Sequence, residues 1–148
     1  MRNVSLLLLI GLAALAGCDG GAGTETEIRS NCSSEGRRGI CNLTLVSIKG
    51  GTYRYELSDD DFWSNGRSVD LTARISVSKG AVKVWLEDPD RKNTTVEVEP
   101  GEKGEIKGTA WLDTLGDKPT CYLYFEPLGH GEAKRAENVQ AEVRYNMP

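Results

Sequence analysis

Two segments of alternating hydropathy, separated by a turn, stand at residues 69–86, VDLTARISVSKGAVKVWL. In the first segment, apolar residues take every second position from 69 to 77. In the second they fall at Val82, Val84 and Leu86. A period of two predicts β-strands that bury one face, and the small and polar residues 78–80 predict a turn between them. This stretch therefore predicts two successive half-buried strands.

The same pattern continues on both sides of this stretch, without a window that suits an amphipathic helix. Strand-like segments recur near residues 41–49, 53–57, 94–99, 106–112, 121–125 and 139–145. Turn residues such as Gly50-Gly51 and Pro100-Gly101 separate them. About eight short strands with turns between them predict an all-β chain, a single antiparallel β-sandwich of jelly-roll or immunoglobulin-like type.

One part of the deciding stretch also carries a family resemblance. Residues 80–90, GAVKVWLEDPD, resemble the strand and turn of bacterial pre-peptidase C-terminal domains and related jelly rolls. The resemblance implies a small β-sandwich accessory module of a secreted protein. It implies no particular activity, because one fold serves many functions.

The start of the chain has the pattern of an export signal. A basic opening with Arg2 precedes an apolar run at residues 4–16, which is shorter than the roughly 20 residues of a membrane-spanning helix. Leu15-Ala16-Gly17-Cys18 then resembles the lipobox of bacterial lipoproteins. That resemblance implies cleavage before Cys18 and diacylglycerol and acyl chains, such as palmitate, on Cys18 as a membrane anchor. The alternative is an ordinary secretory signal with an incidental cysteine.

These features predict three parts: a signal peptide at residues 1–17, a lipidated flexible tether at 18–30 and the sandwich at 31–148. Asp19 resembles the inner-membrane retention signal of enterobacterial lipoproteins. It therefore favours the periplasmic side of the inner membrane over the outer membrane. The alternative is that Asp19 only begins a polar linker.

The charge narrows the choice of partners. The whole chain has a net charge of −4, and removal of residues 1–17 takes away Arg2 and no acid. An acidic domain without clustered Lys and Arg argues against nucleic acid and against anionic lipid head groups as direct ligands. The expected partners are the membrane, through the anchor, and a protein or glycan of the cell envelope.

Export places the three remaining cysteines in an oxidising compartment, which favours a disulfide. Cys32 and Cys41 would close a short polar loop, and Cys121 would then be a buried free thiol. The alternative pair is Cys41 with Cys121, which would join the first strand to a late one. Residue spacing leaves both pairings open.

The sequence suggests neither an enzyme nor a metalloprotein. His130, the only histidine, lies in a glycine-flanked loop, and no serine of the chain lies in a Gly-x-Ser-x-Gly motif. The sequence therefore predicts no catalytic residue. One histidine and scattered cysteines do not suit a zinc site. Acidic clusters at residues 59–61 and 88–90 could offer oxygen ligands to calcium, but aspartates also favour turns for local reasons. No cofactor is expected beyond the acyl anchor.

Four aromatic residues depart from the alternation, because they fall on the nominally solvent-facing side of their strands: Trp85, Trp111, Tyr122 and Tyr124. Grouped on one sheet, they would form a flat platform suited to a sugar ring or a protein partner. The alternative is a face covered by a loop, or a β-bulge that switches the alternation.

Three functions follow from these observations. The first is a membrane-tethered, non-enzymatic binding or assembly module of the envelope. The second is a carbohydrate-binding or cell-wall-binding domain that uses the four aromatic residues. The third is a small envelope hydrolase, for which His130 would need a serine and a carboxylate beside it.

Overall fold

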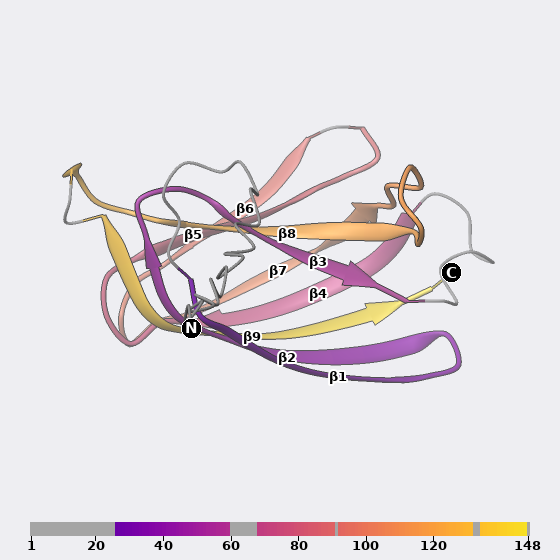
Figure 1. Cartoon of the computed structure of the whole chain (residues 1–148), viewed down its shortest axis with the longest axis horizontal. Coiled ribbons are helices and arrows are strands. Elements are labelled where there is room, and N and C mark those ends of the chain that lie inside the picture. Colours follow the sequence, from indigo (N-terminus) through magenta and orange to yellow (C-terminus); the bar gives the residue numbers. More distant parts are fainter. Residues whose placement is uncertain (1–25, 60–67, 91, 132–133, 148) are drawn as a thin grey trace, which may run out of the picture.

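The computed structural model describes residues 26–59, 68–90, 92–131 and 134–147. These residues form nine strands, β1 (Ile28–Glu35), β2 (Arg38–Lys49), β3 (Tyr53–Ser58), β4 (Ser68–Ser76), β5 (Val82–Glu87), β6 (Asn93–Val98), β7 (Lys103–Trp111), β8 (Thr120–Pro127) and β9 (Arg135–Asn146). The strands make two antiparallel sheets packed face to face, β1-β2-β9-β4-β7 and β3-β8-β5-β6 (Figure 1). The predicted all-β sandwich is confirmed.

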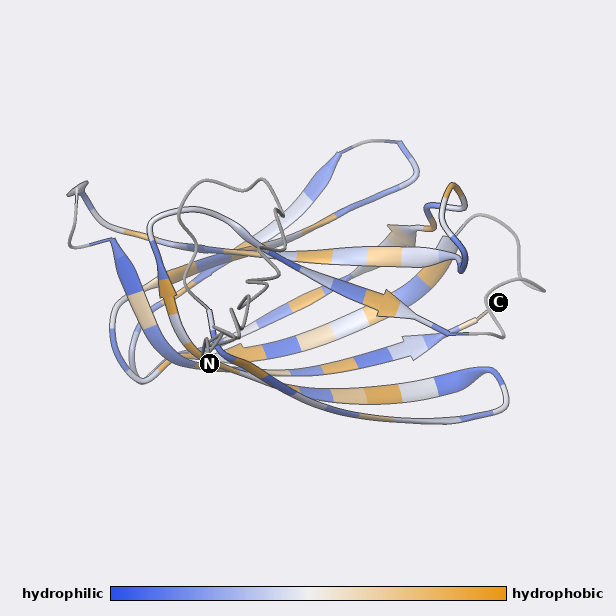
Figure 2. Ribbon diagram, viewed as in Figure 1, coloured by the Kyte–Doolittle hydropathy of each residue, from blue (hydrophilic) through white to orange (hydrophobic). Residues whose placement is uncertain are grey.

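Side-chain alternation builds the core between the sheets. Figure 2 shows hydrophobic and hydrophilic residues alternating along the strands, as expected for strands with one buried face. In β4 and β5 every apolar residue of the pattern points inward, while Lys83 and Trp85 point outward. The largest fully buried side chains are Phe125, Leu45, Ile48, Ile75, Leu86, Ile106, Leu112 and Leu123. The predicted inner face of each of these two strands is therefore confirmed.

The first hairpin differs from the expectation. β1 begins at Ile28, inside the segment expected to be a tether, and residues 33–40 are not a loop but the tip of the β1–β2 hairpin. Gly36 lies in its turn at φ 58°, a conformation that glycine adopts without strain. β1 was missed because it shows no apolar alternation, and it is the one strand beyond the eight that were expected among the described residues.

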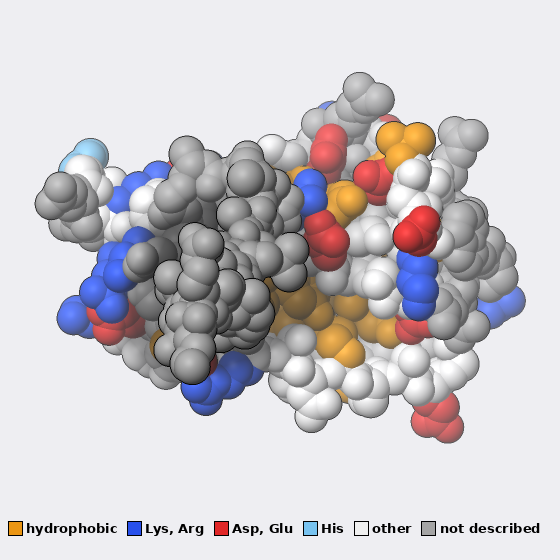
Figure 3. All heavy atoms as spheres, in the orientation of Figure 1, with side chains coloured by type: hydrophobic (Ala, Val, Ile, Leu, Met, Phe, Trp, Pro, Cys, Tyr) orange, Lys and Arg blue, Asp and Glu red, His pale blue; other side chains and the backbone are white. Residues whose placement is uncertain are grey.

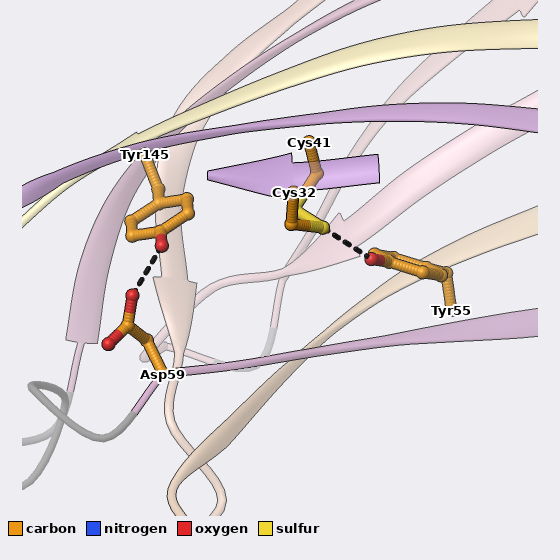
Figure 4. Close-up of a disulfide and its surroundings, with 5 residues drawn as sticks. All are labelled: Cys32, Cys41, Tyr55, Asp59 and Tyr145. Carbon is orange, nitrogen blue, oxygen red and sulfur yellow. Dashed lines mark hydrogen bonds between the residues drawn. A yellow bond between two sulfur atoms is a disulfide. The ribbon is translucent and has the colours of Figure 1, made fainter. Parts of the chain in front are cut away.

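The disulfide joins Cys32 to Cys41, two residues that lie directly opposite each other in the hairpin (Figure 4). The pairing of Cys32 with Cys41 is confirmed, and the alternative of Cys41 with Cys121 is wrong. Cys121 is a buried free thiol, as expected. The Tyr55 hydroxyl lies 3.4 Å from Cys32 Sγ and donates to it, which links the edge strands β1 and β3 of opposite sheets (Figure 4).

A second contact between the sheets involves Tyr145. Its hydroxyl donates to Asp59 Oδ2 at 2.5 Å, just beyond the end of β3 (Figure 4). The aromatic ring lies directly over Gly39, its neighbour across β2 and β9, where any Cβ would sit 2.0 Å from the ring. Burial raises the pKa of Tyr145, and the hydrogen bond to Asp59 raises it further. Gly39 thus allows Tyr145 to lie flat between the sheets and reach Asp59.

One side of the sandwich is incompletely closed. Tyr53, Tyr55 and Ile28 pack against the core but stay partly exposed. Figure 3 shows hydrophobic side chains in the centre of this side of the molecule, with acidic and basic side chains above and to the right of them.

Within the described residues, no helix is both long enough and apolar enough to span a membrane.

Candidate functional site

The outer face of the four-stranded sheet carries three of the four predicted aromatic residues. Trp85 lies on β5, and Tyr122 and Tyr124 lie on β8, each pointing away from the core because its neighbours in sequence point inward. All three side chains are half-buried. Strand pairing places Trp85 directly opposite Tyr124. The alternation therefore brings separate parts of the sequence to one surface.

The rings pack against one another. The Trp85 and Tyr124 rings are nearly parallel, 6° apart, with their centroids separated by 5.2 Å. Such a spacing is that of an offset stack, which aromatic pairs prefer. Tyr122 lies 6.3 Å from Tyr124 and is tilted by 48°. The prediction of a flat platform is therefore corrected, because the rings stand against each other and do not lie side by side in one plane.

The fourth aromatic residue, Trp111, comes from the other sheet. It ends β7 at the edge of the five-stranded sheet and is 36% exposed. The expectation that all four residues share one sheet is thus wrong. Trp111 nevertheless reaches the same place, because it lines an open hollow of about 370 Å³ together with Tyr122 and Tyr124. We call this the aromatic hollow; its full lining is Arg54, Glu87, Trp111, Asp113, Leu115, Tyr122 and Tyr124.

Charged groups surround the rings of the aromatic hollow. The Arg54 guanidinium lies 4.5 Å from the centre of the Tyr122 ring, a cation–π distance, and bonds to Glu56 at 2.6 Å. The Tyr122 hydroxyl donates to Asp113 Oδ2 at 3.2 Å, and the other Asp113 oxygen accepts from the backbone of Leu115. These bonds hold the aromatic and acidic groups in defined positions.

Partial burial is the main reason why the pKa of Tyr122 is raised, and the bond to Asp113 raises it further. Burial also raises the pKa of Tyr124, with Glu87 as the next cause. Both phenols are therefore neutral hydrogen-bonding groups at ordinary pH.

Sequence reasoning missed four lining residues of the hollow. Arg54 and Glu87 share the alternation face of the aromatic residues, so the period of two could have included them. Asp113 and Leu115 follow β7 in a loop, where no periodic signal exists. Leu115 is 96% exposed and adds an apolar group to the rim.

Sequence reasoning also missed a larger concavity on the outer face of the five-stranded sheet. Two adjoining hollows of about 940 and 630 Å³ run along β2, β9, β4 and β7. We call this surface the polar trough, because polar and charged side chains dominate it, among them Thr72, Arg74, Glu105, Gln140 and Arg144. Arg74 and Glu105 pair at 2.9 Å across neighbouring strands. Its residues look like an ordinary solvent face in the sequence, and only the strand order brings them together.

Two further residues singled out in the sequence, His130 and Cys121, do not join either surface in the described part of the chain. His130 is exposed at the β8–β9 connection and makes no hydrogen bond within the described part of the chain. Burial raises the pKa of the Cys121 thiol to about 12, so this cysteine has no nucleophilic character at neutral pH. Cys18 and Asp19 lie outside the described residues.

The two acidic clusters that could have suited calcium have local partners. Asp59 binds Tyr145, and Asp88 accepts from the backbone of Lys92 at 2.8 Å, as an aspartate does in a turn. Asp60 and Asp61 lie outside the described residues. Over residues 26–59, 68–90, 92–131 and 134–147, no three His, Cys, Asp or Glu side chains gather closely enough to hold a metal ion.

Comparison with known proteins gives similarity at the level of shape. No family model and no curated protein matches the sequence. Among solved structures, the chain is similar to a family 11 carbohydrate-binding module of the cellulase Lic26A-Cel5E of Clostridium thermocellum, with 9% identity over 85% of this chain and 87% of that one and a TM-score of 0.36.

Two further structures have comparable scores. The xylan-binding domain CBM22-1 of Paenibacillus barcinonensis Xyn10C has 12% identity over 84% of this chain and 85% of that one, with a TM-score of 0.38. The cysteine peptidase peruvianin-I from Thevetia peruviana latex has 12% identity over 97% of this chain and 84% of that one, with a TM-score of 0.40. These similarities concern the arrangement of strands and carry no information on activity.

Proposed function

We propose that this chain is a lipid-anchored envelope protein whose β-sandwich binds carbohydrate, without catalysis, at the aromatic hollow. The observation that carries the proposal is the convergence of Trp85, Tyr122 and Tyr124 from one sheet with Trp111 from the other. Sugar rings present C–H faces that pack on aromatic rings and hydroxyl edges that need polar partners. Arg54, Glu87 and Asp113 stand where such partners are needed.

The size and openness of the hollow fit a small ligand better than a protein interface. Its volume of about 370 Å³ lies at the lower end of the ~300–1,000 Å³ of small-ligand pockets. The rings are held by stacking and by the Tyr122–Asp113 bond, so binding costs little side-chain entropy. A protein partner remains the competing occupant, since aromatic residues also dominate protein interfaces.

The test is calorimetric titration of the protein with soluble glycans and peptidoglycan fragments. Trp111→Ala and Tyr124→Ala, which change two rings of the hollow's lining, should each weaken binding of the responding glycan by about 10- to 100-fold, the loss typical of an aromatic anchor. Gln140→Ala in the polar trough is the matched control, and it should bind as the parent does. Absence of binding to any glycan, or loss of binding in Gln140→Ala alone, would contradict the proposal.

The anchor is tested separately in cells. Cys18→Ser, or treatment with globomycin, should leave an uncut precursor in place of the cleaved, acylated protein. Density fractionation of membranes should place the acylated protein with the inner membrane if Asp19 acts as a retention signal. Unchanged processing and attachment in Cys18→Ser would contradict the lipid anchor without touching the binding proposal.

A further inference from the structure

The outer face of the four-stranded sheet is acidic around its aromatic residues. The outward-pointing side chains of β3, β8, β5 and β6 include only two bases, Arg54 and Lys83. The acids of this face and of the loop beside it are Glu56, Glu87, Glu97, Glu126 and Asp113. Glu126 pairs with Lys134 at 2.5 Å, and Glu56 pairs with Arg54. The remaining acids give the surface an excess of negative charge.

Two of these acids line the aromatic hollow and lack a basic partner. No Lys, Arg or His of the described ranges lies within 4.0 Å of the carboxylate of Glu87 or of Asp113. Asp113 accepts from a phenol and a backbone amide, which orient the carboxylate and leave its charge in place. Arg54, the one base of the hollow, is already bonded to Glu56.

The ring faces on this surface already attract cations of the chain itself. Arg54 lies over Tyr122, and the Lys83 ammonium lies 5.7 Å from the centre of the Trp85 ring. Both distances fall within the reach of cation–π attraction, which arises from the negative face of an aromatic ring. Negative ring faces and two uncompensated carboxylates therefore act in the same direction on a ligand.

Resting on the proposed function, we propose that the aromatic hollow selects sugars with a protonated amine, of the glucosamine type. The amine would lie between the carboxylates of Glu87 and Asp113, while the sugar ring packs on Tyr124 or Trp111, because Arg54 already lies over the Tyr122 ring. A neutral N-acetyl sugar would gain the stacking and the hydrogen bonds of its hydroxyls, but no attraction between charges. A uronic acid would meet like charge, which disfavours binding.

The test compares sugar oligomers of equal length and different charge, of which the first two differ only in the acetyl group. Glucosamine hexamer, N-acetylglucosamine hexamer and galacturonate hexamer are titrated calorimetrically into the protein at pH 5.5 and low salt, where the amine is protonated and screening is weak. The glucosamine hexamer should bind about tenfold tighter than the N-acetylated one, and the galacturonate hexamer weakest. A lysine hexamer, which has charge without sugar rings, should bind more weakly than the glucosamine hexamer.

Variants that replace one carboxylate by an amide test whether Glu87 and Asp113 cause the preference for the amine. Glu87→Gln and Asp113→Asn should each lower the ratio of glucosamine affinity to N-acetylglucosamine affinity several-fold, because the amide keeps a polar group and loses the charge. Glu97→Gln removes the same charge from β6, outside the hollow, and should keep the preference.

Equal binding of the two amino-sugar hexamers, equal binding of the lysine hexamer, or an unchanged preference in Glu87→Gln would overturn the amine selectivity while the proposed function stands. Absence of any binding that depends on Tyr124 would overturn both.

Discussion

A single methyl group at Gly39 should destabilise the sandwich, because the Tyr145 ring occupies the place of the missing side chain. The Cβ of Gly39→Ala would lie 2.0 Å from Cζ of Tyr145 and 2.1 Å from its hydroxyl oxygen. Real carbon atoms do not approach so closely, so the ring has to move. When it moves, the bond from the Tyr145 hydroxyl to Asp59 is strained or lost.

Three contributions determine how far the free energy of unfolding falls in Gly39→Ala. Overpacking a filled site costs about 1–3 kcal/mol. Loss of one hydrogen bond costs about 0.5–1.5 kcal/mol more. Replacement of glycine within a strand returns about 0.5–1 kcal/mol by reducing the freedom of the unfolded chain. The free energy of unfolding of Gly39→Ala should therefore fall by ~2–3 kcal/mol.

Gly108→Ala, in β7 of the same sheet, is the matched control. Its Cβ would meet Thr94 and Leu86 at 3.5 Å or more, which is ordinary contact. This variant should match the parent or gain about 0.5–1 kcal/mol. Urea unfolding followed by tryptophan fluorescence measures both variants, in a chain that carries Cys18→Ser so that no acyl chain is attached.

A double-mutant cycle isolates the ring as the cause. In a Tyr145→Leu background the methyl group has no ring to displace, so Gly39→Ala should cost less by at least ~1 kcal/mol. The reasoning is refuted if Gly39→Ala is as stable as the parent, or if its cost is the same in both backgrounds.

Three further predictions concern the cysteines and the rim of the aromatic hollow. Replacing Cys32 and Cys41 together by alanine should lower the free energy of unfolding by about 2–3 kcal/mol, as for a bridge between residues nine apart, and a reductant should do the same to the parent. The Cys121 pKa is raised from 9.0 to about 12, so the protonated thiol stabilises the fold fully below pH 9 and this stabilisation is lost as the pH rises through 12. Urea midpoints between pH 9 and pH 11 should decline less in Cys121→Val. Leu115→Ser should change stability by less than ~0.5 kcal/mol, because the side chain is 96% exposed.

The alternation in the sequence predicts the sheets well where one face is buried. In β5, Val82, Val84 and Leu86 point inward and Trp85 outward, as the period of two requires. β1 defeats the same reasoning, because Ile28 is its only large apolar residue and the rest of the strand is exposed. Backbone pairing with β2 and the disulfide hold β1 in place, and neither leaves a periodic signal.

The candidate site was predictable only in part for a related reason. Alternation places Trp85, Tyr122 and Tyr124 on outer faces, but it does not say which strands are neighbours. Pairing of β5 with β8 supplies that information. Trp111 joins them from the other sheet where the chain leaves β7, and Asp113 reaches Tyr122 through a loop. Contacts between residues of different sheets depend on tertiary structure and have no local sequence pattern.

The direction of β1 sets the orientation of the domain with respect to an anchor. The chain enters the sandwich at Ile28, and β1 runs from there to Glu35, beside the end of β9 at Asn146. β4 begins near Asn146, and its first residue, Ser68, lies opposite Trp111. An eight-residue strand is about 25 Å long. The lipid proposed at Cys18 would thus be joined to the end of the sandwich where β1 begins, and Trp111 would lie at the opposite end of the domain.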